Sequence, residues 1–249
     1  MTDATRPLEV GRPQFLGGWR DGPESPSALA NEVHIWRIPL NGAVPASLAD
    51  MADDERRRAD AFVRRGDGLR WAASRLALRG ILGRYLGMSP SEIRFERVRG
   101  GKPRAAGADL HYNLTHSFDL ALCAVARTDV GVDLERIRAA PMAAGVAAGI
   151  VSADGPIRPG EAGSAELDWA FFHAWTRVEA ALKATGEGLS AIDRRSQAWI
   201  RALTVSGPVT VDDRPLMLVD LPVEEGYAGA LAIMGAGAIE AIQCWSWTG

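Results

Sequence analysis

Two carboxylates in a short apolar segment are the first residues that suggest chemistry. Residues 131–135 read Gly-Val-Asp-Leu-Glu. If this segment is a strand, its side chains alternate between two faces, so Asp133 and Glu135 point to the same side. Like charges this close are unfavourable unless a cation lies between them, and Mg²⁺ prefers oxygen ligands. The segment therefore indicates a magnesium site. The alternative is a half-buried strand with an acidic, solvated outer face, which has the same alternation.

A second group of candidates lies on a helix expected at residues 166–185. Trp175, Glu179 and Lys183 are spaced four residues apart and therefore share one helical face. Glu179 would add a third carboxylate to the metal site, and Lys183 would meet a phosphate one turn further along. The alternative is an ordinary Glu–Lys surface pair beside a core tryptophan.

Two upstream segments offer groups that suit an anion. Thr115, His116 and Ser117 come at the end of an expected strand and carry two hydroxyls and an imidazole. The Gly-Gly-Lys-Pro turn at residues 100–103 presents Lys102. The alternatives are a structural histidine and a plain exposed turn.

Lysine is scarce in this chain. Of 28 cationic side chains, only Lys102 and Lys183 are lysines. A compact ammonium suits phosphate contacts in a way that a planar guanidinium does not, so both sites are candidates for phosphate binding. A chance distribution of lysines is the alternative.

The composition is that of a globular protein. The chain has 249 residues, of which 47% are hydrophobic and 24% charged, which allows one large domain or two small ones. No apolar run approaches the ~20 residues of a membrane span, and no signal core follows the N-terminus. We therefore expect a cytoplasmic protein without membrane contact. Cys123 and Cys244 lie in separate apolar segments, which favours buried thiols over a disulfide or a zinc site.

Charge is distributed unevenly along the chain. Residues 56–104 contain 14 Lys or Arg and 4 Asp or Glu, so this segment carries +10 whereas the whole chain carries −3. Such a segment could bind nucleic acid, an acidic protein or a phosphorylated small molecule. No nucleic-acid recognition motif accompanies it, so we expect no nucleic-acid partner.

Hydrophobic periodicity predicts the elements that position these residues. Helices are expected at 56–65, at 67–86 with a stop at Gly87, and at 166–185, and one more is possible within 139–163. In the second helix, Arg75 and Arg79 are expected to project away from the packing face. Strands are expected at 33–38, 93–98, 110–117, 120–126, 130–135, 198–205, 216–219, 227–233 and 239–247. The strands at 120–126 and 130–135 read as a hairpin or a consecutive pair.

The order of these elements predicts the fold class. Strands and helices occur in blocks rather than in strict alternation, which is typical of an α+β fold. Strand, helices and strands occur once before residue 127 and again after it, a weak architectural duplication. We expect a Pro/Gly-rich arm at 1–30, an N-terminal α+β half at 31–127 and a C-terminal α+β half at 128–249.

Taken together and in order, these segments resemble the 4′-phosphopantetheinyl transferases of the larger, pseudo-dimeric type that activates nonribosomal peptide and polyketide synthases. That family shows a Gly-Lys-Pro turn, an Asn-x-Ser-His segment, Gly-x-Asp-x-Glu, and a helix reading Trp-x-x-Lys-Glu-Ala-x-x-Lys before a Gly-x-Gly turn. The counterparts here are residues 101–103, 113–116, 131–135, 175–183 and 186–188. The Arg-rich stretch around Arg58 also resembles the N-terminal half of the family.

The resemblance implies a fold and a reaction. Two similar α+β halves would be related by pseudo-twofold symmetry, with the site in the cleft between them. The phosphopantetheine of coenzyme A would move to a serine of an apo acyl or peptidyl carrier protein, and adenosine 3′,5′-bisphosphate would be released. The carrier would be acidic and the enzyme a monomer.

The resemblance also implies residue roles. Mg²⁺ would be held by Asp133, Glu135 and Glu179. Lys183 would contact the attacked phosphate, and Glu179 or a water held by it would accept the serine proton. The residues implied for coenzyme A are Arg58, Lys102, Pro103, Thr115, His116 and Lys183.

Three positions depart from the family pattern. Val178 replaces the usual lysine before the helix glutamate, Thr115 replaces the common serine, and residues 150–152 only faintly match the segment that docks the carrier. An alternative is therefore a catalytically weak relative that binds coenzyme A or a carrier protein as an interaction module. A second alternative is an unrelated Mg²⁺-dependent nucleotide hydrolase.

Overall fold

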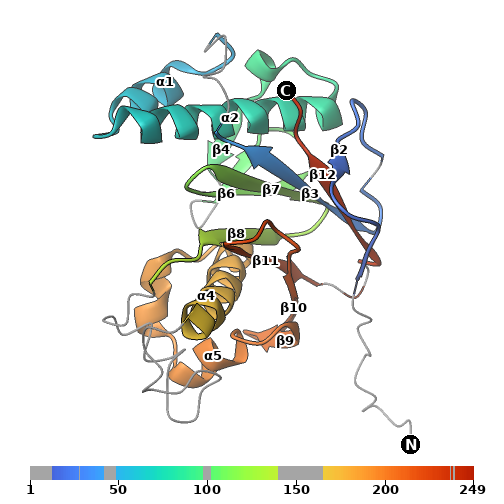
Figure 1. Cartoon of the computed structure of the whole chain (residues 1–249). Coiled ribbons are helices and arrows are strands. Elements are labelled where there is room, and N and C mark those ends of the chain that lie inside the picture. Colours follow the sequence, from blue (N-terminus) through green and yellow to red (C-terminus); the bar gives the residue numbers. More distant parts are fainter. Residues whose placement is uncertain are drawn as a thin grey trace, which may run out of the picture.

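Four layers make up the protein (Figure 1). The structure is a computed structural model that describes residues 13–27, 29–41, 49–97, 102–139, 165–235, 237 and 239–249. Helix α2 (Arg65–Leu86) covers one sheet, a second sheet lies behind the first, and helix α4 (Ala165–Thr185) covers the second sheet. The mixed α+β class expected from the order of elements is confirmed.

The first sheet joins the two ends of the described chain. Its strand order is β1-β12-β3-β7-β6, with β2 also pairing with β12. Strand β12 runs parallel to β3, and β7 runs antiparallel to both β3 and β6. The strands are β1 (Gln14–Phe15), β2 (Arg20–Asp21), β3 (Glu32–Pro39), β6 (His111–Ser117), β7 (Leu120–Ala126) and β12 (Ala241–Ser246).

The second sheet is antiparallel and has the order β8-β11-β10-β9. Its strands are β8 (Val130–Arg136), β9 (Gly207–Val211), β10 (Arg214–Asp220) and β11 (Tyr227–Met234). The expected pairing of residues 120–126 with 130–135 is wrong, because β7 and β8 belong to different sheets. All of β7 and the first five residues of β8 are buried, and side chains of both strands meet in the core between the two sheets. The short link between the strands therefore connects two layers rather than closing a hairpin.

The expected boundary at residue 127 lies between β7 of the first sheet and β8 of the second. The last strand, β12, does not follow this division, because it belongs to the first sheet. Strand β12 completes the first sheet beside β3, and the arm strands β1 and β2 pair with it. Hydrophobic side chains fill three core layers: between α2 and the first sheet, between the two sheets, and between the second sheet and α4. Both cysteines are buried free thiols, as expected.

The helices agree with the periodicity except at two places. Helix α2 ends at Gly87, whose φ of 64° is the left-handed conformation that favours glycine. Helix α1 (Asp53–Asp60) includes the acidic residues that precede the expected segment 56–65 as its first turn, and it ends at Asp60 rather than at residue 65. The strand expected at 198–205 is wrong: helix α5 (Gln197–Ala202) occupies this position, and the side chain of Ser196 caps it.

Short elements complete the described chain. They are the 3₁₀ helices η1 (Pro90–Glu92) and η2 (Leu189–Arg194) and the paired strands β4 (Phe95–Arg97) and β5 (Pro103–Ala105). The possible helix within 139–163, the segment 150–152 and the first residues of the 100–103 turn lie outside the described residues. Within the part that is described, no helix combines the length and apolarity needed to cross a membrane.

Candidate active site

Three carboxylates from two elements converge on one point. Asp133 and Glu135 extend from the same face of β8, and Glu179 reaches them from α4. One oxygen from each lies within 4.8 Å of the others. Asp133 is 2% exposed, so the alternative of an acidic, solvated strand face is excluded. The two carboxylates of the strand and the glutamate of the helix therefore meet, as the sequence predicted.

A glycine allows the helix to come this close. A Cβ atom placed on Gly131 would lie 2.0 Å from the carbonyl oxygen of Ala180 and 2.4 Å from the backbone nitrogen of Ala184. No side chain fits in that space, since both atoms belong to the backbone of α4. Glu179 precedes Ala180 on this helix, so the glycine of the strand determines how near the third carboxylate comes to the other two.

Lys183 lies inside the cluster rather than on the surface. Its Nζ donates to Asp133 Oδ1 at 2.5 Å, to Thr115 Oγ1 at 3.1 Å and to the carbonyl of Val132 at 3.3 Å. Its distance to Glu179 Oε2 is 3.7 Å. The Glu–Lys spacing on α4 is thus part of a four-residue charge group and not an isolated surface pair.

The donor set fits a divalent cation. Three carboxylates and one ammonium leave an excess of negative charge in a largely buried place. Burial and the nearby Asp133 and Glu135 raise the pKa of Glu179 to about 8, with Lys183 opposing them. Asp133 Oδ2 is buried and accepts no hydrogen bond from the described residues. A hard cation such as Mg²⁺ would satisfy that oxygen and relieve the repulsion.

Strand β6 ties the first sheet to this cluster. Thr115 Oγ1 donates to Asp133 Oδ1 at 3.0 Å, and Ser117 Oγ donates to Glu135 Oε2 at 3.0 Å. Asn113 Oδ1 accepts a hydrogen bond from the backbone nitrogen of Val132 at 2.8 Å. Alternate residues of β6 therefore hold β8 in register, a role that sequence reasoning did not assign to Asn113 or Ser117.

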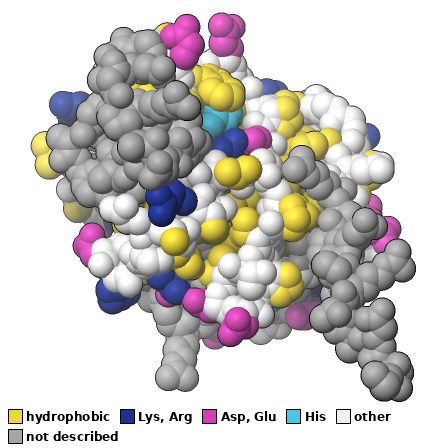
Figure 2. Space-filling model, turned by 90° about the horizontal axis from the view of Figure 1, so that it is seen from below, with side chains coloured by type: hydrophobic (Ala, Val, Ile, Leu, Met, Phe, Trp, Pro, Cys, Tyr) yellow, Lys and Arg dark blue, Asp and Glu magenta, His cyan; other side chains and the backbone are white. Residues whose placement is uncertain are grey.

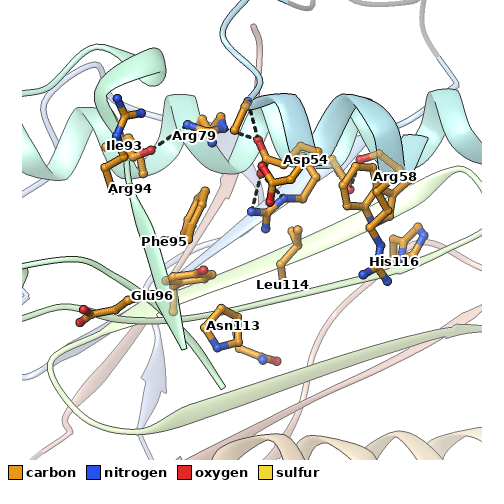
Figure 3. Close-up of a pocket in the computed structure, with 17 residues that line it drawn as sticks. Asp54, Arg58, Arg79, Ile93, Arg94, Phe95, Glu96, Asn113, Leu114 and His116 are labelled. Carbon is orange, nitrogen blue, oxygen red and sulfur yellow. Dashed lines mark hydrogen bonds and ion pairs between the residues drawn. The ribbon is translucent and has the colours of Figure 1, made fainter. Parts of the chain in front are cut away.

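The neighbouring residue His116 faces a cavity of about 610 Å³ instead (Figure 3). The cavity lies between helices α1 and α2 and strands β4, β5 and β6, and its volume is in the range of sites for small molecules and cofactors. Burial lowers the pKa of His116, and the positive charges of Lys183 and Arg70 add to this effect. The charged residues lining the cavity are Arg58, Arg75, Arg79, Arg94, Asp54, Glu55 and Glu96.

A buried ion group forms one wall of this cavity. Glu55 is 6% exposed and accepts hydrogen bonds from Arg75 Nη2 at 2.6 Å, from Arg79 Nε at 2.8 Å and from the backbone nitrogen of Ala52 at 3.1 Å. Arg79 also donates to two backbone carbonyls at 2.9 Å. Arg75 and Arg79 were expected only to project away from the packing face; the structure adds that Glu55 provides a buried partner for both, which the sequence did not indicate.

Removal of this partner is expected to destabilise the N-terminal half strongly. The Glu55→Ala variant leaves the buried Arg79 guanidinium without its carboxylate, and breaking a buried pair costs about 3–5 kcal/mol. Asp54→Ala is the matched control, because this exposed neighbour in the same helical turn contributes less than ~1 kcal/mol. Urea unfolding measures both; equal midpoints would contradict the role of Glu55.

Lys102 lies apart from the carboxylate cluster. Its Nζ donates to the carbonyl of Val130 at 2.8 Å and is 3.5 Å from Asp129 Oδ1, and burial lowers its pKa. The same Asp129 oxygen is 2.9 Å from His111 Nδ1. Pro103 lines the cavity, but Lys102 is not among the lining residues. The structure therefore brings together one of the two lysines, Lys183, with the metal-ligand candidates.

Comparisons with known proteins show which sequences this chain resembles. No family model matches the chain. Over 228 residues it is 33% identical to the 4′-phosphopantetheinyl transferase HetI of Nostoc sp., covering 88% of this chain and 94% of that protein. It is 26% identical to the 4′-phosphopantetheinyl transferase Sfp of Bacillus subtilis, covering 74% and 82%, and 33% identical to psf-1 of Bacillus pumilus, covering 50% and 53%. Because the match to the Nostoc protein spans nearly the whole of both chains, this chain belongs to the 4′-phosphopantetheinyl transferase family.

Proposed function

We propose that this chain transfers the 4′-phosphopantetheinyl group of coenzyme A to a serine of an apo acyl or peptidyl carrier protein. The reaction depends on Mg²⁺ and releases adenosine 3′,5′-bisphosphate. The observation that carries the proposal is the convergence of three carboxylates and Lys183 beside a cavity lined by arginines. Phosphoryl transfer needs mainly positioning and neutralisation of charge, and this arrangement supplies both.

Asp133, Glu135 and Glu179 are the residues that would hold the metal. Their oxygens are close enough for one ion, and the unpartnered oxygen of Asp133 is a ready ligand. Bound there, Mg²⁺ would neutralise the pyrophosphate of coenzyme A. Glu179 is the carboxylate that α4 contributes to the group. We assign to it, or to a water that it holds, the acceptance of the serine proton.

Lys183 and Thr115 would orient the phosphate that is attacked. They are hydrogen-bonded to each other at 3.1 Å and both contact Asp133, so a phosphate bound beside the metal ligands would meet an ammonium and a hydroxyl together. Val178, where the family usually has lysine, is fully buried in the core between α4 and the second sheet. Packing thus explains its apolar character and does not favour an inactive relative.

The cavity would receive the nucleotide part of coenzyme A. Arg58 and His116, drawn near one another in Figure 3, are the residues we assign to its phosphates. Pro103, which also lines the cavity, would contact the same part of coenzyme A. A role of Lys102 in phosphate binding would require its ammonium to leave the Val130 carbonyl.

Further features of the proposal concern the whole molecule. One long helix covers the outer face of each sheet, and the inner faces of the two sheets pack against each other, which supports a pseudo-twofold relation between the halves. We propose a cytoplasmic monomer whose carrier partner is acidic. The excess of arginine between residues 56 and 104 would attract such a carrier.

Incubation with coenzyme A, Mg²⁺ and a panel of apo carrier domains tests the function. Intact-protein mass spectrometry is expected to detect a gain of one phosphopantetheinyl group on at least one carrier, and chelation of the metal should stop it. Carrier binding without a gain in mass would indicate an interaction module. Breakdown of coenzyme A without any carrier would indicate a hydrolase.

The Lys183→Arg variant is expected to transfer about 10- to 100-fold more slowly despite its preserved charge. The ammonium donates to one oxygen of β6 and two oxygens of β8 at 2.5–3.3 Å, and a planar guanidinium cannot reproduce that geometry. Single-turnover rates at saturating coenzyme A measure the effect. An unchanged rate would show that charge alone is used at this position.

A further inference from the structure

The turn between β6 and β7 carries an exposed aromatic side chain. Only Phe118 and Asp119 connect the two strands, and Phe118 is 54% exposed with a φ of 57°. Glycine is the residue that usually supplies a positive φ in a two-residue hairpin turn, because a Cβ atom makes it unfavourable. The chain thus keeps a large apolar group in a backbone conformation that disfavours it, and strain of this kind occurs at functional positions.

Two arginines from different elements approach this ring. The guanidinium carbon of Arg136, at the end of β8, lies 4.1 Å from the ring centroid, and that of Arg70, on α2, lies 5.6 Å from it. Arg70 also pairs with Asp67 at 2.6 Å. No ion pair to Arg136 occurs among the described residues, so its charge is available to another molecule. We call Phe118, Arg70 and Arg136 the aromatic–arginine patch.

The patch borders the carboxylate cluster. Ser117, next to Phe118, donates to Glu135 at 3.0 Å, and its hydroxyl accepts from the backbone nitrogen of Arg136 at 3.0 Å. A molecule that contacts Phe118 would therefore lie close to Glu135, one of the metal-ligand candidates, because only Ser117 separates the two. The face that Figure 1 shows at the bottom is viewed directly in Figure 2. Among its described residues, basic, acidic and apolar side chains are interspersed.

We propose that the aromatic–arginine patch is a docking surface for the carrier protein. An apolar side chain of the carrier would cover Phe118, and flanking carboxylates of the carrier would pair with Arg70 and Arg136. The inference rests on the proposed function and deepens it by naming where the protein substrate binds. An exposed aromatic ring between two guanidinium groups complements an acidic surface with an apolar centre, and aromatic and arginine side chains provide much of the binding energy of interfaces.

Phe118→Gly is the decisive variant. It removes the ring and places the residue that suits the turn, so the melting temperature should stay the same or rise. The KM for the apo carrier is expected to increase about tenfold, as for loss of an interface anchor, whereas kcat and the KM for coenzyme A remain unchanged. Phe118→Tyr keeps the ring and should behave as the parent. An unchanged KM for the carrier would overturn the proposal, and so would a rise only in the KM for coenzyme A, which would assign the ring to the pantetheine arm.

The charged part of the patch has its own test. Arg136→Gln should raise the KM for the carrier about three- to fivefold at low ionic strength, and the difference should shrink with added salt because screening weakens the pairing. Arg214→Gln is the matched control: this exposed arginine starts β10, beyond β11 from β8, and the same loss of charge there should have no effect. Equal effects of both variants would indicate only general attraction.

The two proposals can fail separately. Absence of transfer by the parent protein with every carrier contradicts the proposed function. The patch is tested independently by calorimetric titration of the same apo carriers into the parent and into Phe118→Gly. Equal affinities contradict the docking surface, and weaker binding by Phe118→Gly supports it whether or not transfer occurs.

Discussion

Transfer by the Glu179→Gln and Asp133→Asn variants is expected to fall by about 10³-fold or more, because each loses one anionic ligand of the proposed metal. Both substitutions keep the shape of the side chain, so the rate reports charge and coordination rather than packing. The measurement is the rate of mass gain on the apo carrier. Normal turnover by either variant would refute the assignment of the metal site.

Stability separates this loss of activity from misfolding. Without Mg²⁺, Glu179 lies in a buried group with two other carboxylates, and this environment raises its pKa to about 8. Below that pH the metal-free carboxyl is largely protonated, so Glu179→Gln should melt at the same temperature as the parent, whereas above it the variant removes a repelling charge and should melt at a higher temperature. Added Mg²⁺ should raise the melting temperature of the parent but not that of the variant.

A matched variant on the same helix controls for the change in net charge. Glu166 lies in the first turn of α4 and is exposed. Glu166→Gln should therefore leave both the transfer rate and the response to Mg²⁺ unchanged. A large effect of Glu166→Gln would indicate that the rate depends on the overall charge of α4 rather than on the carboxylate cluster.

The parts of the site that could be predicted from sequence are those governed by local periodicity. Alternation along a strand places Asp133 and Glu135 on one face, and the four-residue spacing of a helix aligns Glu179 with Lys183. Gly87 ends its helix because a residue in the left-handed backbone conformation cannot continue the helical hydrogen bonds. These rules hold over a few residues and do not depend on what packs against them.

Strand pairing could not be predicted in the same way. Strands β7 and β8 are apolar runs separated by three residues, which is also what a hairpin would look like in sequence. Whether such strands pair or enter different sheets depends on partners more than 90 residues away, such as β11 for β8. The same holds for β12, which joins β3 at the opposite end of the chain. The duplicated order of elements contained no sign of this pairing between the first and last strands.

Buried charges were the other failure. Arginines on a helix are normally exposed, and Arg79 was expected only to project away from the packing face, but the residue is 2% exposed. Its partner Glu55 is 24 positions away and reads in sequence as one of three acidic residues that begin a helix. The scarcity of lysine was informative for only one of the two residues, since Lys183 lies in the carboxylate cluster and Lys102 donates to the first residue of β8, Val130.

The Gly131→Ala variant is expected to show the second large effect, through geometry alone. A methyl group at this position would overlap the Ala180 carbonyl, so α4 must move outward by about 1 Å, and a displacement of that size at a reacting group costs about 10²-fold in rate. Unfolding should also become easier, because the contact between α4 and β8 loosens. Gly18→Ala is the control, since no atom lies within 4 Å of its Cβ. If Gly131→Ala kept full activity, the close approach of α4 to β8 would not be what holds Glu179 against the two strand carboxylates.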